Sequence, residues 1–183
     1  MSKKYNIIYA DPPWRYETFD KRNVVPYPVM KDEDIKNLPI QNIADKDCIL
    51  FMWATFPKLE LALETIKAWG FKYRSLGFSW IKKNKKSDSY FWGMGYWTRQ
   101  NCEVCLIATK GKPHRKSMGV HSVIATPIEE HSKKPDIVRD KIVELMGDLP
   151  RVELFCRHPA QGWDSIGNEI DGKDIREVLQ CLK

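Results

Sequence analysis

The sequence lacks several features that would assign its class directly. No apolar run reaches membrane-spanning length, and no signal-peptide pattern precedes the first strand-like segment, so we expect no membrane association. No G-x-G-x-x-G follows any predicted strand, which disfavours a nicotinamide enzyme. The five cysteines are odd in number, and the C-x-x-C from Cys102 to Cys105 has no second pair beside it. We therefore expect reduced cysteines, no zinc site and a cytoplasmic location.

Charged and aromatic residues are abundant instead. The 183 residues are 43% hydrophobic, enough to build a core, and we predict a single domain over residues 1–183. The net charge of +6 favours a polyanionic partner. Seven tryptophans and seven tyrosines accompany the basic residues. Because aromatic rings stack on bases while cations hold phosphates, this combination favours nucleic acid as the partner.

Apolar runs alternate with helical patterns along the chain. Strands are predicted at residues 5–10, 48–54, 76–81, 103–109 and 151–156. Helices are predicted at residues 32–38, 59–69 and 173–181, and from a start near Ser132, with Pro135 in the first turn, to an end at Gly147. This alternation indicates an α/β, Rossmann-like fold with a mostly parallel sheet and helices on both faces.

The first predicted strand ends in Asp11-Pro12-Pro13-Trp14. Two consecutive prolines cannot continue a ladder of backbone hydrogen bonds, so Asp11 and the carbonyls around Pro12 project beyond the carboxyl end of the strand. In open α/β sheets, ligands bind at that edge. The structural alternative is a proline-stiffened turn with Trp14 packed in the core.

This tetrapeptide suits chemistry on a nucleobase amine. Such an amine is a poor nucleophile because its lone pair is conjugated with the ring. Asp11 and the Pro12 carbonyl, held rigidly by the proline pair, could each accept one N–H bond and direct the lone pair toward an electrophile. Trp14 offers a face on which the base can stack, which contributes about 1–3 kcal/mol per base. A duplex base would have to be flipped out to reach this turn.

Residues 82–101 form a second unusual segment. The four lysines Lys82, Lys83, Lys85 and Lys86 precede a cluster of aromatic residues. A solvated loop is the ordinary interpretation of a lysine run. The aromatic cluster behind the lysines favours a loop that contacts nucleic acid.

The sequence resembles a known family at these motifs. Asp11-Pro12-Pro13-Trp14 resembles the D-P-P-[aromatic] motif of amino methyltransferases. Nearly the whole chain resembles the adenine-N6 methyltransferases typified by the catalytic subunit of the eukaryotic mRNA adenosine methylase, with bacterial and phage relatives. The other matching blocks are Pro26-Tyr27 with Met30, Leu50-Phe51-Met52-Trp53, Trp80-Ile81-Lys82, Glu103-Val104-Cys105-Leu106, Ser132-Lys133-Lys134-Pro135-Asp136, Glu153-Leu154-Phe155 with Arg157, and Trp163 with Gly167-Asn168.

The resemblance implies a Rossmann-like methyltransferase fold in permuted order, with the catalytic strand first, and S-adenosylmethionine as methyl donor. The resemblance also implies that the motif residues Asp11, Pro12, Pro13 and Trp14 orient and border the adenine amine. Matching acceptor-pocket positions are Tyr27, Trp80 and Glu103, and Lys83, Lys85 and Lys86 are predicted to contact nucleic acid. Matching donor-side positions are Asp11, Lys134, Arg157, His158, Asn168 and Glu169.

Some of these residues also have ordinary structural interpretations. Trp80 could belong to the core, His158 could be a turn residue, and Glu169 could cap a helix. The chain departs from the family pattern as well. The glycine-rich donor loop resembling F-x-G-x-G is missing, and Glu169 stands where the eukaryotic relatives carry an amide.

The leading functional hypothesis is methylation of adenine N6 in DNA. RNA is the close alternative, because the motif cannot distinguish the two sugars. A catalytically inactive nucleic-acid-binding subunit is a third hypothesis, and cytosine-N4 or protein-amide methylation would use the same amine chemistry. We expect a nucleic-acid partner and either a homodimer or a heterodimer with a related subunit.

Overall fold

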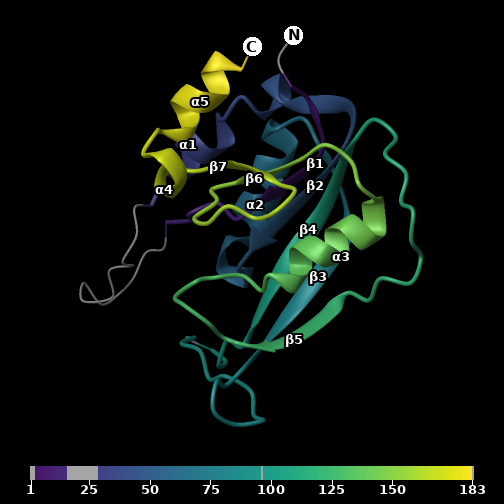
Figure 1. Ribbon diagram of the computed structural model, residues 1–183. Coiled ribbons are helices and arrows are strands. Elements are labelled where there is room, and N and C mark those ends of the chain that lie inside the picture. The colour runs from purple at the N-terminus through teal and green to yellow at the C-terminus, as the bar shows by residue number, and fades with distance from the viewer. Residues whose placement is uncertain (1–2, 16–28, 96, 183) are drawn as a thin grey trace.

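The computed structural model describes residues 3–15, 29–95 and 97–182, which form a sheet of seven strands in the order β5-β3-β4-β2-β1-β6-β7 (Figure 1). The strands are β1 (Tyr5–Ala10), β2 (Ala44–Ala54), β3 (Lys72–Lys83), β4 (Cys102–Lys110), β5 (Val123–Pro127), β6 (Arg151–Leu154) and β7 (Asp164–Ile166). The helices are α1 (Asp32–Lys36), α2 (Leu59–Ala68), α3 (Ile137–Met146), α4 (Asn168–Asp171) and α5 (Ile175–Cys181), with short 3₁₀ helices at Ile40–Asn42 and Phe56–Lys58. None of the described helices is both long and apolar enough to cross a membrane.

The sheet is mostly parallel, as predicted. β1 pairs in parallel with β2 and β6, β3 with β5, and β6 with β7. β4 runs antiparallel to both of its neighbours, β2 and β3. Among the described strands β4 is therefore the reversed one, and its amino end lies at the same edge as the carboxyl ends of the other strands. We call this edge the carboxyl edge.

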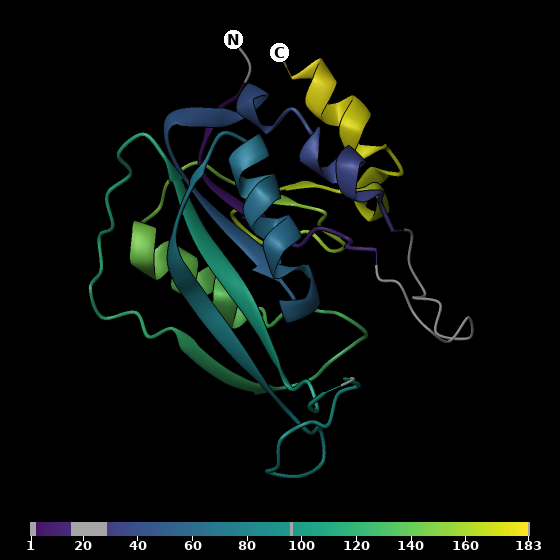
Figure 2. The ribbon, with the colours of Figure 1, turned by 180° about the vertical axis from the view of Figure 1, so that it is seen from behind.

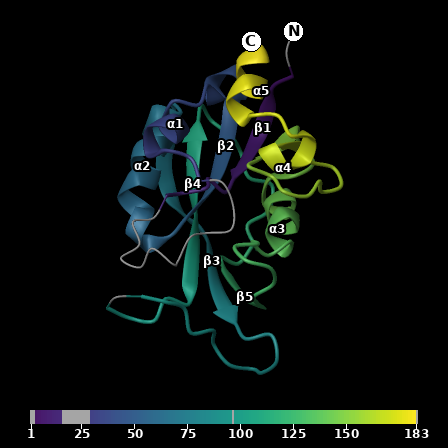
Figure 3. The same ribbon diagram turned by 90° about the vertical axis from the view of Figure 1, so that its left-hand side faces the viewer.

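Helices cover both faces of the sheet, which confirms that part of the prediction. α1 and α2 lie on one face and α3 on the other (Figures 2 and 3). The buried side chains alternate accordingly along β2: Leu50 and Met52 pack in the cluster that includes α1, α2 and α5, whereas Phe51 and Trp53 pack in the cluster that includes α3. β2 is apolar on both faces because both faces are covered.

The structure corrects two predicted boundaries and adds strands that were not predicted, β7 among them. α3 begins at Ile137, so Ser132 and Pro135 precede the helix instead of starting it. β6 ends at Leu154 because Phe155 has a φ of 59°, which lies in the left-handed region and cannot continue a strand. Strand β7 was not predicted, since three residues are too few to show a periodic pattern.

Candidate functional site

The Asp11–Trp14 turn after β1 is fixed at both ends. The Trp14 amide donates to the Pro12 carbonyl at 2.8 Å, which closes a tight turn and sets the direction of that carbonyl. The Trp14 indole Nε1 donates to the Trp53 carbonyl at 3.2 Å, and the Trp14 side chain is 4% exposed. Trp14 thus packs in the core, as expected for a proline-stiffened turn. It also lines a cavity beside Asp11.

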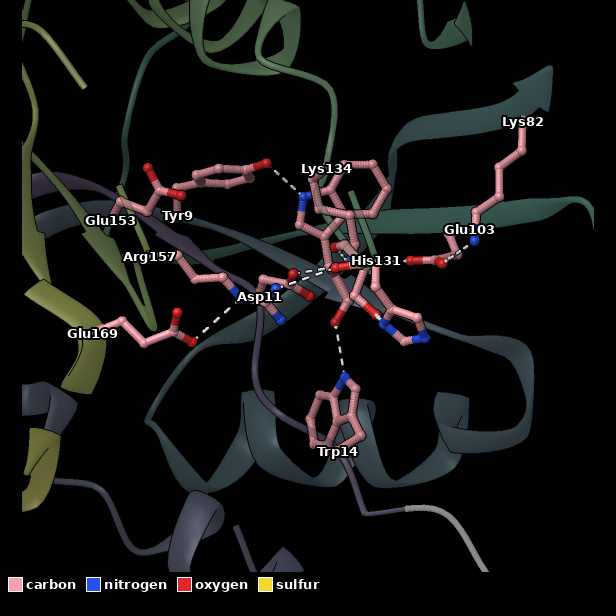
Figure 4. A network of polar contacts seen from close by, with 12 residues as sticks. Tyr9, Asp11, Trp14, Lys82, Glu103, His131, Lys134, Glu153, Arg157 and Glu169 are labelled. Atoms are coloured by element: carbon pink, nitrogen blue, oxygen red, sulfur yellow. Dashed lines mark hydrogen bonds and ion pairs between the residues drawn. The ribbon is translucent and has the colours of Figure 1, made fainter. Parts of the chain in front are cut away.

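A largely buried row of charges of alternating sign ends at Asp11 (Figure 4). Lys134 Nζ donates to Asp11 Oδ2 at 2.8 Å, to Glu103 Oε2 at 3.2 Å and to the Ser132 carbonyl at 3.1 Å. The other Glu103 oxygen pairs with Lys82. These contacts use all three donors of the Lys134 ammonium group. The row Lys82–Glu103–Lys134–Asp11 therefore joins β3, β4, the segment before α3 and the turn after β1.

Burial and neighbouring charges set the protonation of this row. Burial raises the pKa of Asp11, and the Lys134 charge only partly opposes that rise. Burial also acts to raise the pKa of Glu103, but Lys134 and Lys82 outweigh it and hold that pKa below its ordinary value. For Lys134, burial acts to lower the pKa, and the carboxylates of Asp11 and Glu103 raise it overall. Glu103 and Lys134 are thus held ionised, whereas Asp11 is the carboxyl with raised proton affinity.

A cavity of about 550 Å³ follows the carboxyl edge. This volume lies within the range of roughly 300–1,000 Å³ that small-molecule sites occupy. Its walls run from Glu103 at the start of β4, past Asp11, to Asn168 after β7 and Arg176 on α5. Asp11 thus lies between Glu103, a predicted acceptor-side residue, and the predicted donor-side residues Asn168 and Glu169.

A second cavity of about 500 Å³ lies on the side of the sheet that α3 covers. Its walls include an ion pair in which the Arg139 guanidinium donates to both Glu153 oxygens, at 2.6 and 2.8 Å. The two cavities share the wall residues Asp11, Ser132, Lys134, Phe155 and Arg157. A ligand in the first cavity that contacts Asp11 therefore also borders the second cavity.

Most of the predicted donor-side residues meet in the first cavity. Arg157 Nε lies 3.6 Å from Glu169 Oε1, and Asn168 Oδ1 accepts from the Ile175 amide at 3.2 Å. β7 places Asn168 and Glu169 there, because it pairs with β6 and ends at the same edge. His158 lies apart from them and lines the second cavity.

Two predicted acceptor-side residues have different outcomes. Glu103 lines the first cavity. Trp80, in contrast, is in the core: its side chain is 2% exposed, its Nε1 donates to Thr126 Oγ1 at 2.9 Å, and its ring lies edge-on to that of Trp53. Trp80 lines neither cavity, because its position in β3 turns it toward the α3 face, and its role in an acceptor pocket stays a prediction. Tyr27 lies outside the described residues.

The segment that follows β3 extends beyond the end of the sheet (Figure 1) and contains Lys85 and Lys86, whereas Lys83 is the last residue of β3. Lys85 and Lys86 are exposed, and Lys83 forms an ion pair with Asp88. Exposed aromatic residues share this segment: Trp92 is 77% exposed and Trp97 is 91% exposed. The lysines and the aromatic rings are thus accessible to a large partner.

Sequence reasoning missed several contributors to the site, including Lys82 and Arg176. Lys82 holds Glu103, and the signal that could have found it is its place in the block Trp80-Ile81-Lys82. Arg176 lines the first cavity from α5, and no motif marks it.

Comparisons with known proteins place the chain in a family. A family model described as MT-A70 matches residues 5–169. The type II methyltransferase M.MunI of a Mycoplasma species is 32% identical over 97% of this chain and 83% of its own length. An Arabidopsis thaliana N(6)-adenosine-methyltransferase MT-A70-like protein and the Homo sapiens N(6)-adenosine-methyltransferase catalytic subunit METTL3 are each 32% identical, over 98% and 92% of this chain. The chain spans 25% and 29% of the lengths of these two relatives. The chain belongs to the MT-A70 family.

Proposed function

We propose that this protein transfers a methyl group from S-adenosylmethionine to the N6 amine of adenine in DNA. The observation that supports it most is the position of Asp11, a partly buried carboxyl that lines the cavity and has Lys134 paired with one of its oxygens. DNA is proposed before RNA because the chain matches most of the type II methyltransferase but less than a third of each adenosine methyltransferase named above.

The Asp11 turn would bind and deprotonate the amine. Lys134 occupies Asp11 Oδ2, which leaves Oδ1 as an acceptor for one N–H, and the second lone pair of the Pro12 carbonyl accepts the other. Bound S-adenosylmethionine would supply a methyl group on a positively charged sulfur, and S-adenosylhomocysteine would leave as the nitrogen–carbon bond forms and the carbon–sulfur bond breaks. The methylated nitrogen must then lose a proton. The raised pKa of Asp11 suits Oδ1 to accept that proton.

The residues on the β7 side fit the donor. Asn168 and Glu169 offer amide and carboxylate groups to ribose hydroxyls, as an acid near the end of a neighbouring strand does in Rossmann folds. Arg157 lines the same cavity and supplies a guanidinium group that can pair with the methionine carboxylate. Lys134 is better suited to positioning Asp11, since its three donors already have acceptors.

The end of β3 and the segment that follows it supply the contact with the nucleic-acid backbone in this proposal. Lys83, Lys85 and Lys86 would contact phosphates, and the exposed rings of Trp92 and Trp97 would stack on unpaired bases. The dimer, the cytoplasmic location and the single-domain organisation remain predictions.

The test is transfer of a labelled methyl group to matched oligonucleotides of duplex DNA, single-stranded DNA and RNA. We expect labelled DNA, with N6-methyladenine found by mass analysis of the digested product. Transfer only to RNA would support the alternative that RNA is the substrate. Detection of N4-methylcytosine in the digested product would show that cytosine, and not adenine, accepts the methyl group. No transfer to any of them would favour the inactive subunit.

A further inference from the structure

We propose that the junction of α1 and α5 binds the nucleobase of the methyl donor, with Arg176 as the stacking surface and Asp34 as the acceptor for the base's amino group. We call Asp34, Asp174 and Arg176 the junction residues. This inference rests on the proposed function, since it assigns the far end of the same cavity. All three residues line that cavity, at the end opposite Glu103.

Arg176 is held in one orientation. Its Nε donates to Asp174 Oδ1 at 2.9 Å, and its Nη2 donates to Asp174 Oδ2 at 2.5 Å. The Arg176 amide also donates to Asp174 Oδ1, at 2.8 Å, so the carboxylate is itself fixed at the start of α5. The side chain of Arg176 remains 51% exposed. A planar guanidinium fixed through one edge keeps its faces available, and such faces stack on nucleobases.

The junction residues Asp174 and Arg176 flank Ile175, whose amide binds Asn168, one of the two residues that fit the ribose. Asn168 Oδ1 accepts from the Ile175 amide at 3.2 Å, which ties the start of α4 to α5 between Asp174 and Arg176. A ribose held by Asn168 and Glu169 therefore has its base directed either back toward Asp11 or on toward α5. The first direction is needed for the sulfur and its methyl group, which must face Asp11. The base consequently occupies the α5 end.

Asp34 gives this end a chemical preference. Its Oδ2 lies 3.5 Å from Arg176 Nη1 and its side chain is 40% exposed, so it borders the guanidinium without being saturated by it. A carboxylate accepts hydrogen bonds and donates none. It therefore favours a purine with an exocyclic amino group, such as adenine, over one with a carbonyl oxygen in that place, such as hypoxanthine. The site accordingly selects an adenosyl donor.

The test measures binding of S-adenosylhomocysteine, the product of transfer, by titration calorimetry without nucleic acid. Arg176→Ala is expected to weaken binding roughly 10- to 100-fold, which corresponds to the loss of one base stack. Arg176→Lys should weaken it similarly, because an ammonium group keeps the charge but not the plane. The matched control is Lys173→Ala, which removes a nearby exposed cation that does not line the cavity.

The preference of Asp34 is tested with S-inosylhomocysteine. The wild type should bind it at least about tenfold more weakly than S-adenosylhomocysteine, and Asp34→Asn should reduce this difference because an amide can also donate. Wild-type affinity in Arg176→Ala, or an equal affinity of the wild type for the two ligands, would overturn the inference. Those results leave the proposed function standing if transfer persists, whereas a wild type that neither binds S-adenosylhomocysteine nor transfers methyl groups contradicts the proposed function itself.

Discussion

The two ends of the first cavity differ in how far their charged side chains are exposed to solvent. At the β4 end, the side chains of Lys134 and Glu103 are each 11% exposed. At the α5 end, Arg176 and Asp34 are 51% and 40% exposed. Buried charges depend on their partners, because each was removed from water, whereas exposed charges are screened by it. The charges at the β4 end should therefore contribute to the stability of the fold, whereas those at the α5 end can be changed with little loss of stability.

The largest effect is expected at Lys134. Replacing it with Met leaves the buried carboxylate of Glu103 and the partly buried carboxylate of Asp11 without their shared cation, which should cost about 3–5 kcal/mol in the free energy of unfolding. Urea denaturation measures this loss. The control is Lys133→Met, whose side chain is 29% exposed and should change stability by less than about 1 kcal/mol. An equal loss in both variants would show that the buried row does not stabilise the fold.

Lys82→Met should give a smaller effect that depends on pH. Glu103 has a lowered pKa, so its contribution to stability is complete above the ordinary value of 4.5 and is lost as the pH falls through its folded value. The variant removes part of that contribution, about 1.5–3 kcal/mol at pH 7. Urea titrations of both proteins should show this difference shrinking below the ordinary pKa of Glu103. A difference that does not vary with pH would exclude Glu103 as its cause.

The loop lysines should affect binding rather than stability. Replacing Lys83, Lys85 and Lys86 with Ala should reduce the slope of log affinity against log salt by about 2, since each phosphate contact contributes roughly 0.7–0.9. Lys83 is the weakest contributor because of its ion pair with Asp88. Fluorescence anisotropy with labelled DNA measures the slope, with exposed Lys67→Ala on α2 as the control. An unchanged slope would leave this segment an ordinary solvated loop.

The smallest effect on stability is expected at Arg176. Arg176→Ala should lower the free energy of unfolding by less than about 1 kcal/mol in urea, because its ion pairs are exposed. A loss as large as that of Lys134→Met would remove the contrast between the two ends of the cavity.

The sequence predicts the strands and the Asp11 turn because both depend on local patterns. The direction of β4 could not be predicted, since an apolar run predicts a strand without indicating whether it is parallel or antiparallel to its neighbours. That direction decides the site: Glu103 begins its strand and Asp11 follows its own, and they meet because β4 is reversed. The resemblance to the family identified Glu103 as a site residue, whereas the spacing of residues along the sequence could not.

Other parts of the site depend on packing between distant segments. Trp80 could be assigned to pocket or core from the sequence, and only the packing of β3 against Trp53 decides for the core. Arg176 lies on a short amphipathic helix, where an arginine is an ordinary surface residue. Its position in the cavity follows from the contact of α5 with Asn168, which no local pattern encodes.

The most direct test of the central claim compares wild type with Asp11→Asn in two measurements, labelled methyl transfer to the preferred oligonucleotide and binding of S-adenosylhomocysteine. Asn keeps the size of the side chain but cannot accept the amine proton at Oδ1. We predict a loss of transfer of about 100-fold or more, with the affinity for S-adenosylhomocysteine changed by less than about fivefold. Transfer at the wild-type rate in this variant would contradict the role of Asp11 and the mechanism built on it.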